Sequence, residues 1–283
     1  MFETFELSRF LGKPVRLFVF TRQNQVWRYC TADRDLVIGG NTYLSAQIDR
    51  SEIKQTAERA KDKITIKLAY LRDPTAPEYP VTQALGDNWF PFVPSSTVYV
   101  MCLATHYGDT DPPAVEWMGQ VTQPKFSDVE LELTCEPTGG TDRARNQGAK
   151  WQRGCWKTVY STGLRGCNLN PDLFKVEATL TGVSGLTLTA PAFGTAPINL
   201  SGGALTWTNA NGVIERRSIM SHVGTSIRLL YGSDDLANGL SVTALPGCPR
   251  TWAACEERAN TDNYGGAIYK PVKDPMKDSM SWG

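Results

Sequence analysis

Four cysteines in the second half of the chain are the residues whose type and spacing best suit a chemical site. Cys155 and Cys167 are separated by eleven residues, Cys248 and Cys255 by six, and a long segment lies between the two pairs. Glycine, proline and tryptophan surround both pairs. Two cysteine pairs that meet can form one four-thiolate site. Such a site would join residues that are far apart in the sequence.

Three chemistries are open for these cysteines. The N-terminus, residues 1–6, is acidic and lacks the basic region of a secretory signal, so we expect folding in the cytoplasm, where disulfides are rare. Structural zinc usually takes pairs two to four residues apart, and spacings of eleven and six are wide for it. A 4Fe–4S cluster needs only four correctly aimed thiolates. Spacing alone does not separate iron–sulfur from zinc.

The remaining three cysteines, Cys30, Cys102 and Cys135, each lie within a strand-like run. The total of seven is odd, which excludes complete pairing in intrachain disulfides. We predict that these three are buried and act as small apolar side chains.

Known catalytic motifs are missing from the sequence. The only histidines, His106 and His222, have no serine, cysteine or glutamate at a recognisable catalytic spacing, and no P-loop, G-x-S-x-G or H-E-x-x-H occurs. The acidic stretch 108–111 lacks the later glycine and glutamate of an EF-hand and is expected to be a turn. We therefore expect no enzymatic activity.

Composition limits the classes of partner. The 283 residues have 41% hydrophobic content and a formal net charge of zero, with 29 basic and 29 acidic residues. A chain-wide basic footprint for nucleic acid is absent, so no sequence-specific nucleic-acid binding is predicted. No run reaches the roughly 18 apolar residues of a membrane helix.

The elements that must position the cysteines are mainly strands. Residues 1–145 are predicted as an N-terminal β domain, a barrel or sandwich, with period-2 alternation at 63–68 and a hairpin turn at 39–41. Residues 172–245 are predicted as an inserted small β domain of five to seven strands, with a turn at Asn211-Gly212. Residues 146–171 and 246–283 form the cysteine-ligated module, with one short helix expected between Pro249 and Asn260.

Prolines and aromatic residues crowd the segment 74–94. Proline cannot donate to a strand ladder, so this segment is predicted as a connection. Two interpretations of this segment remain: a contact with another protein, or an ordinary buried loop.

The cysteine segments resemble a known family. The residues that match are Gly154-Cys155, Gly166-Cys167, Gly247-Cys248, Cys255, Arg258, Asn260 and Tyr264-Gly265-Gly266, and an N-terminal run over 18–50 is also similar. The order of these residues resembles that in the baseplate hub proteins of long-tailed siphophages and gene transfer agents. Those proteins are related to the tail-tip protein L of lambda-type phages. The resemblance extends over most of the chain.

The resemblance implies a structural virion component at the tail tip, folded in the host cytoplasm. It implies that Cys155, Cys167, Cys248 and Cys255 ligate a 4Fe–4S cluster, with zinc as the alternative. It also implies a homotrimer between the distal tail protein and the central fibre or tail-tip attachment protein, possibly touching the tape-measure protein. A soluble iron–sulfur electron-transfer protein is the rival class. Five cations near the cysteines could offset the charge of four thiolates, although each is expected on the surface: Arg153, Lys157, Arg165, Arg250 and Arg258.

Overall fold

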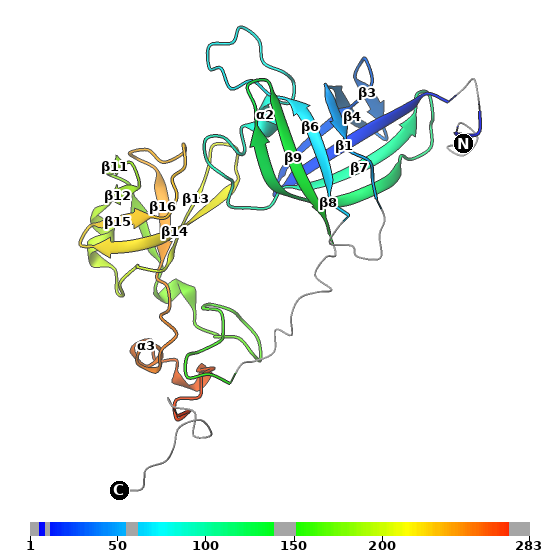
Figure 1. Cartoon of the computed structure of the whole chain (residues 1–283). Helices are drawn as coiled ribbons and strands as arrows, with labels where there is room; N and C mark the ends of the chain where they lie inside the picture. The colour runs from blue at the N-terminus through cyan, green and yellow to red at the C-terminus, as the bar shows by residue number, and fades with distance from the viewer. Residues whose placement is uncertain (1–5, 9–11, 55–61, 139–150, 272–283) are drawn as a thin grey trace, which may run out of the picture. The chain divides into compact units, whose positions relative to one another are not determined.

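The computed structural model describes residues 6–8, 12–54, 62–138 and 151–271, and it is mainly β, as the sequence predicts (Figure 1). The chain divides into two compact units. One comprises Met1–Ala144 with Ala210–Val213, and the other comprises Arg145–Asn209 with Ile214–Gly283.

The first unit contains a nine-stranded sheet in the order β3-β4-β2-β1-β7-β8-β9-β6-β5. Its strands are β1 (Pro14–Arg22), β2 (Gln25–Cys30), β3 (Leu36–Ile38), β4 (Asn41–Ser45), β5 (Ile48–Arg50), β6 (Ile64–Ala69), β7 (Tyr99–His106), β8 (Ala114–Phe126) and β9 (Glu130–Pro137). The predicted hairpin at 39–41 joins β3 and β4, and both Gly39 and Gly40 have positive φ there.

The two ends of this sheet are joined by a short stretch of chain. β4 pairs in parallel with β2, with Tyr29 opposite Leu44. Two residues separate the end of β4 from the start of β5, and β5 pairs with β6 at the other end of the sheet. The connecting backbone bonds to both sides: Ala46 N donates to Cys30 O (3.1 Å), and the carbonyl of Gln47 accepts from Ala69 N (3.1 Å). The sheet is therefore closed as a barrel, which leaves fewer unpaired strand edges.

The barrel interior is filled by alternating side chains from facing strands. Leu131, Leu133 and Cys135 of β9 are fully buried, and the intervening residues of β9 are only half-buried, as period-2 alternation predicts. The predicted burial of Cys30, Cys102 and Cys135 is confirmed, since each is at most 1% exposed.

Burial should make the barrel thiols unreactive. It raises the pKa of Cys102 to about 12 and also raises the pKa of Cys135. The thiolate is the nucleophile, so at pH 8 both groups remain thiols while the barrel is folded. We expect iodoacetamide to leave Cys102 and Cys135 unmodified in native protein and to modify both in urea, as read by peptide mass mapping. Modification at equal rates in both conditions would contradict this packing.

The proline-rich segment 74–94 has a buried part and an exposed part. The short helix α2 (Gln83–Gly86) lies within it, and Leu85 and Trp89 join the barrel core. Beyond them Phe90, Phe92 and Val93 are partly or largely exposed. The buried-loop interpretation therefore holds only for the middle of the segment, around Leu85 and Trp89.

The second unit contains a seven-stranded sheet in the order β10-β16-β13-β14-β15-β12-β11. Its strands are β10 (Val176–Thr179), β11 (Gly182–Ser184), β12 (Thr187–Thr189), β13 (Ala204–Thr208), β14 (Ile214–Val223), β15 (Ser226–Leu229) and β16 (Ser241–Leu245), with 3-10 turns η3 (Pro171–Leu173) and η4 (Pro191–Thr195). The long strand β14 pairs with β13 over its first half and with β15 over its second, and an irregularity lies between Ile219 and Ser221. The core of this unit includes Phe193, Leu205 and Trp207.

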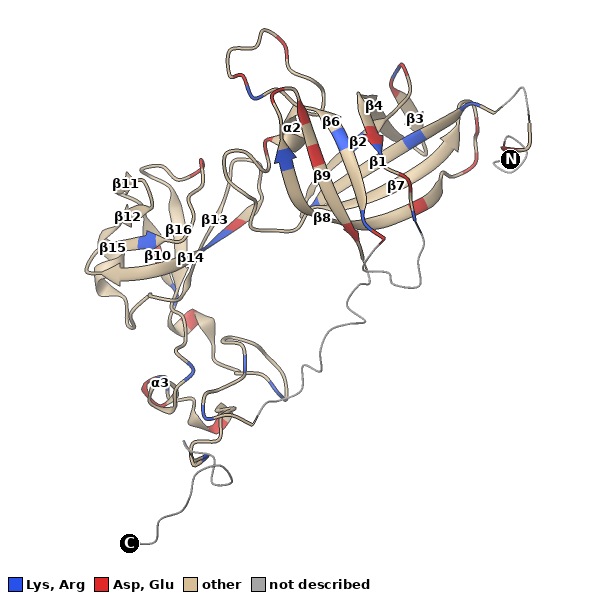
Figure 2. Ribbon diagram, in the orientation of Figure 1, with Lys and Arg blue, Asp and Glu red and all other residues tan. Residues whose placement is uncertain are grey.

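Charged side chains of both signs are interspersed over the described parts of the sheets (Figure 2). At β6 and β9 they pair across the strands: Lys67 Nζ lies 3.2 Å from Glu130 Oε1, and Lys63 Nζ, just before β6, lies 2.6 Å from Glu136 Oε1. None of the helices in the described ranges is long and apolar enough to cross a membrane.

Candidate functional site

The four cysteines lie in segments with little regular structure, which follow and precede the seven-stranded sheet. The helix there, α3 (Trp252–Glu257), begins later than the predicted start at Pro249. Thr251 is its N-cap and accepts a hydrogen bond from Ala254 N (3.3 Å). Cys248 therefore precedes the helix and Cys255 lies within it, close to its end.

The four cysteines lie in one region of the fold, where the two cysteine segments meet. Burial raises the pKa of Cys255, and the nearby charges of Cys167, Cys155 and Cys248 raise it further. Burial likewise raises the pKa of Tyr264, with added contributions from three of the same cysteines. The structure thus brings the two cysteine pairs together, although they are separated by some eighty residues of β structure.

Hydrogen bonds between backbone and side-chain groups join the two segments. Cys155 N donates to Arg250 O (2.8 Å), and Asn260 Nδ2 donates to Cys167 O (2.8 Å). The hydroxyl of Tyr264 donates to Arg153 O (2.7 Å) as well. Each pair is therefore tied to the other through polar contacts.

These segments contribute few buried apolar side chains, among them Leu169 and Ala254. None of the three clusters of buried apolar side chains in the described ranges includes a residue from 151–171 or 246–271. A segment without an apolar core needs another source of stability, such as a disulfide or a metal. All seven cysteines are free thiols in the structure.

Three of the four cysteine sulfurs accept an N–H hydrogen bond, whereas the sulfur of Cys255 has a different partner. The donors are Gly265 N to Cys155 Sγ (3.3 Å), Asn260 Nδ2 to Cys167 Sγ (3.4 Å) and Arg250 N to Cys248 Sγ (3.4 Å). The thiol of Cys255 instead donates to the backbone carbonyl of Asn260, with Sγ 3.0 Å from the oxygen.

One of the five nearby cations is buried. Arg258 is 7% exposed; its Nη1 donates to Ala254 O (2.8 Å), and its Nη2 donates to Gly247 O (2.9 Å). The expectation of a surface position was wrong for Arg258, because its guanidinium satisfies two carbonyls beside the cysteines. Arg153, Arg165 and Arg250 are exposed and Lys157 is half-buried.

The pair Gly265-Gly266 allows a close approach of two backbones. A Cβ at Gly266 would collide with the carbonyl oxygen of Arg153 and lie 2.9 Å from the carbonyl carbon of Gly154. Neither neighbour is a flexible side chain, so the clash cannot be relieved by rotation. A Cβ at Gly154, in contrast, would meet only Arg250 O at 3.6 Å, an ordinary contact.

We expect Gly266→Ala to destabilise the cysteine segments by about 1–3 kcal/mol, the usual cost of overpacking. Gly154→Ala is the matched control and should change little. Hydrogen exchange of residues 151–171 and 246–271 reports the difference. Equal protection in the two variants would show that the tight approach at Gly266 is not needed.

Four cysteine side chains are the type of ligand that a metal ion or an iron–sulfur cluster binds as thiolates. The described residues include no group of three or more His, Cys, Asp or Glu side chains arranged to hold a metal ion. A single zinc ion needs its sulfurs about 2.3 Å from one point. A 4Fe–4S cluster instead binds each thiolate through a different iron, so its four sulfurs need not surround one point. The N–H groups aimed at three sulfurs fit a thiolate, because hydrogen bonds to the charged form stabilise it.

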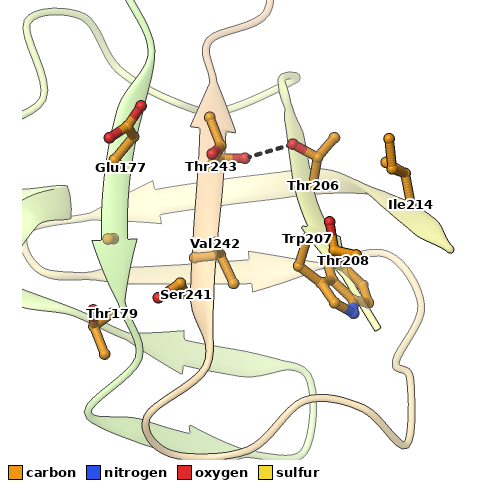
Figure 3. A pocket seen from close by; sticks show the side chains of 10 residues that line it. Glu177, Thr179, Thr206, Trp207, Thr208, Ile214, Ser241, Val242 and Thr243 are labelled. Carbon is orange, nitrogen blue, oxygen red and sulfur yellow. Dashed lines mark hydrogen bonds between the residues drawn. The ribbon is translucent and has the colours of Figure 1, made fainter. Parts of the chain in front are cut away.

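A second candidate site is an open cavity of about 520 Å³ on the second unit, bordered by β10, β16 and β13 (Figure 3). Its polar lining consists of hydroxyl groups and one carboxylate: Thr179, Thr206, Thr208, Ser241, Thr243 and Glu177. Thr206 Oγ1 donates to Thr243 O (3.2 Å), which holds two of these strands in register. The hydroxyl groups can donate and accept hydrogen bonds, and the carboxylate of Glu177 can accept them.

The two histidines have structural surroundings. His106 is 3% exposed, at the end of β7, and its Nε2 lies 3.1 Å from Glu6 Oε1. The Nδ1 of His222 accepts from Leu200 N (3.2 Å). At the acidic stretch 108–111, Asp109 accepts from the backbone N–H of Asp111, as expected of a turn.

Comparison with known proteins shows which sequences this mainly β chain resembles. Residues 199–274, which include Cys248, α3 and Cys255, match a family described as "Phage conserved hypothetical protein BR0599". The chain is also 33% identical to an uncharacterised protein of Xylella fastidiosa, with all of both chains covered. The chain therefore belongs to the same family as that protein, and it carries a domain conserved in phages.

The fold is shared with a solved structure. A chain in the virion of a native gene transfer agent particle has a TM-score of 0.74, with 99% of this chain and 97% of that chain covered. Sequence identity is 16%, so this similarity concerns the fold. It extends over both units and the cysteine segments.

Proposed function

We propose that the protein is a non-enzymatic structural component of a phage-type virion, and specifically the baseplate hub at the tail tip. The observation that supports this most directly is that nearly the whole chain has the fold of a gene transfer agent virion protein, while its residues 199–274 match a phage-conserved family. In this role the hub links the distal tail to the central fibre or receptor-binding assembly. Host attachment and genome delivery are the functions of that assembly.

The cysteine segments, in this proposal, are held together by a 4Fe–4S cluster on Cys155, Cys167, Cys248 and Cys255. The convergence of the four thiols supports it, as do the N–H groups aimed at three of them. The cluster cross-links segments that lack an apolar core, so its binding free energy stabilises their fold. Zinc in the same site is the second candidate.

Absorption spectroscopy of anaerobically purified protein, combined with iron, sulfide and zinc assays, identifies the bound metal. A broad band near ~400 nm with about four irons per chain supports the cluster. One zinc per chain in colourless protein supports the zinc alternative. Folded protein without either metal contradicts both.

The assembly role includes a homotrimer around the tail axis, with the distal tail protein, the central fibre protein and the tape-measure protein as neighbours. The exposed part of the segment 74–94, formed by Phe90, Phe92 and Val93, is the proposed contact with one of them. Apolar side chains exposed together are typical of protein interfaces.

The assembly role is tested by light scattering on the purified chain and by mass spectrometry of purified particles. We expect a trimer and a fixed, small copy number per particle. We also expect Phe92→Asp to reduce incorporation into particles, with Val37→Asp, an exposed apolar position on β3, as the surface control. A metal-loaded monomer that is absent from particles would support the electron-transfer alternative.

A further inference from the structure

The outer face of the seven-stranded sheet, over β10, β16 and β13, carries an array of hydroxyl groups. Alternate residues of each strand are buried in the core, so the residues between them share the outer face. The polar residues on this face are Glu177 and Thr179 of β10, Ser241 and Thr243 of β16, and Thr206 and Thr208 of β13. All six line the open cavity of about 520 Å³ shown in Figure 3.

The strand register arranges these side chains in two rows. In one row Glu177 lies opposite Thr243, which in turn lies opposite Thr206. In the other row Thr179 lies opposite Ser241. Neighbouring strands are about 4.8 Å apart, and residues two apart on one strand are separated by about 6.6 Å. The array therefore spans an area that one or two hexose rings can cover.

The hydroxyl groups in the cavity differ from others on the same sheet in their hydrogen bonding. In the described part of the chain, the only hydrogen bond from a hydroxyl of the array is the one from Thr206 Oγ1 to Thr243 O (3.2 Å). Elsewhere on this sheet, the hydroxyl of Thr181 donates to Thr189 O (3.1 Å), and the hydroxyl oxygens of Thr189 and Ser226 lie 3.2 Å apart. The cavity hydroxyls thus keep donor and acceptor capacity for a ligand.

The charges around the cavity favour a neutral ligand. Glu177 Oε1 lies 3.2 Å from Nζ of Lys175, which immediately precedes β10, and Arg216 lies opposite Thr206 on β14. Neither cation is among the described residues that line the cavity, and Glu177 is the only charged residue of that lining. A phosphate or sulfate group in the cavity would therefore meet a carboxylate before it met a cation, and like charges repel.

We propose that this face of the sheet is a binding site for the neutral sugar units of a carbohydrate. Sugar hydroxyls donate and accept hydrogen bonds, as the threonine and serine hydroxyls do, and they can donate to the carboxylate of Glu177. Ile214, which lies opposite Thr208 and lines the same cavity, is 57% exposed and offers an apolar contact to the C–H face of a sugar ring. All of these residues belong to the seven-stranded sheet, so the site is independent of the proposed metal and of the position in the virion.

Binding is tested with the full-length chain on an array of neutral and anionic bacterial polysaccharides, followed by isothermal titration calorimetry with the neutral polysaccharide that binds best. Ser241→Ala combined with Thr243→Val removes two hydroxyls and keeps the Thr243 carbonyl that accepts from Thr206. Since one lost hydrogen bond weakens binding by a factor of about two to ten, we expect the double variant to bind about tenfold more weakly or less. Thr187→Val on β12, at an exposed threonine outside the cavity, is the matched control and should bind as the unaltered chain does.

A second measurement needs no variant. Hydrogen exchange of the unaltered chain with and without the polysaccharide should show added protection in β10, β13 and β16 and none in the nine-stranded sheet. The proposal is overturned if no neutral polysaccharide binds, or if the double variant and the unaltered chain bind with equal affinity. Binding confined to sulfated or phosphorylated polysaccharides overturns it as well, and would place an anion site near Arg216 instead.

Discussion

Replacing one cysteine of each pair, as in Cys155→Ala with Cys248→Ala, should remove the metal completely and unfold the cysteine segments. The two residues come from the two segments that the site joins, so no ligand set of one segment alone remains. Because the described apolar cores include no residue of 151–171 or 246–271, nothing else in the cores replaces the lost cross-link. The proposed function therefore makes the cluster the main source of stability in these segments.

The expected size of the effect follows from metal–folding linkage. Apparent binding free energies of structural metal sites reach about 10–16 kcal/mol in zinc-finger peptides, so we expect the cysteine segments to lose at least about 5 kcal/mol. Hydrogen exchange should become fast in 151–171 and 246–271 while the strands of both sheets stay protected. Cys30→Ala is the control, since Cys30 is buried in the first unit and should leave metal content unchanged. Protection of the cysteine segments in the metal-free double variant would contradict a metal-dependent fold.

The strands and turns were predictable because their causes are local. Alternating side chains at 63–68 define β6, and Gly39-Gly40 supplies the positive φ of the turn between β3 and β4. The sequence did not distinguish a barrel from a sandwich, because the closure of the barrel depends on the parallel pairing of β2 with β4. Such a pairing leaves no pattern in a single sequence.

The start of α3 was misplaced for a tertiary reason. Pro249 suits a first helical turn, but Arg250 has φ of 62°, and its carbonyl accepts from Cys155 N. A backbone committed to that long-range bond cannot enter a helix at the same residue. Thr251, the next residue, is the actual N-cap and is among the preferred cap residues, so the local signal was present.

The resemblance singled out several residues near the cysteines without showing what their side chains or backbone groups do. Asn260 and Gly265 stand out in the motif, but their roles as hydrogen-bond donors to Cys167 and Cys155 require the fold. The burial of Arg258 depends on the convergence of two carbonyls that are seven residues apart in the sequence. No periodicity reports such a convergence.

Replacing Arg258 with alanine should destabilise the cysteine segments strongly. The side chain satisfies the carbonyls of Gly247 and Ala254, and its removal leaves both without that donor in a buried place. An unsatisfied buried group costs about 1–3 kcal/mol, so the loss of two should cost about 2–5 kcal/mol. Since Gly247 precedes Cys248 and Ala254 precedes Cys255, we also expect a lower iron content after reconstitution.

Two further variants separate hydrogen bonding from charge. Arg153→Ala removes an exposed cation near the same cysteines, so it lowers the local positive charge equally without uncovering a buried carbonyl. Arg258→Lys keeps the charge but not the forked donor geometry, so it should recover only part of the stability. Urea unfolding of metal-loaded protein gives the comparison. If Arg153→Ala and Arg258→Ala lose equal stability, Arg258 acts through charge alone; a larger loss in Arg258→Ala, with partial recovery in Arg258→Lys, identifies the two hydrogen bonds as the cause.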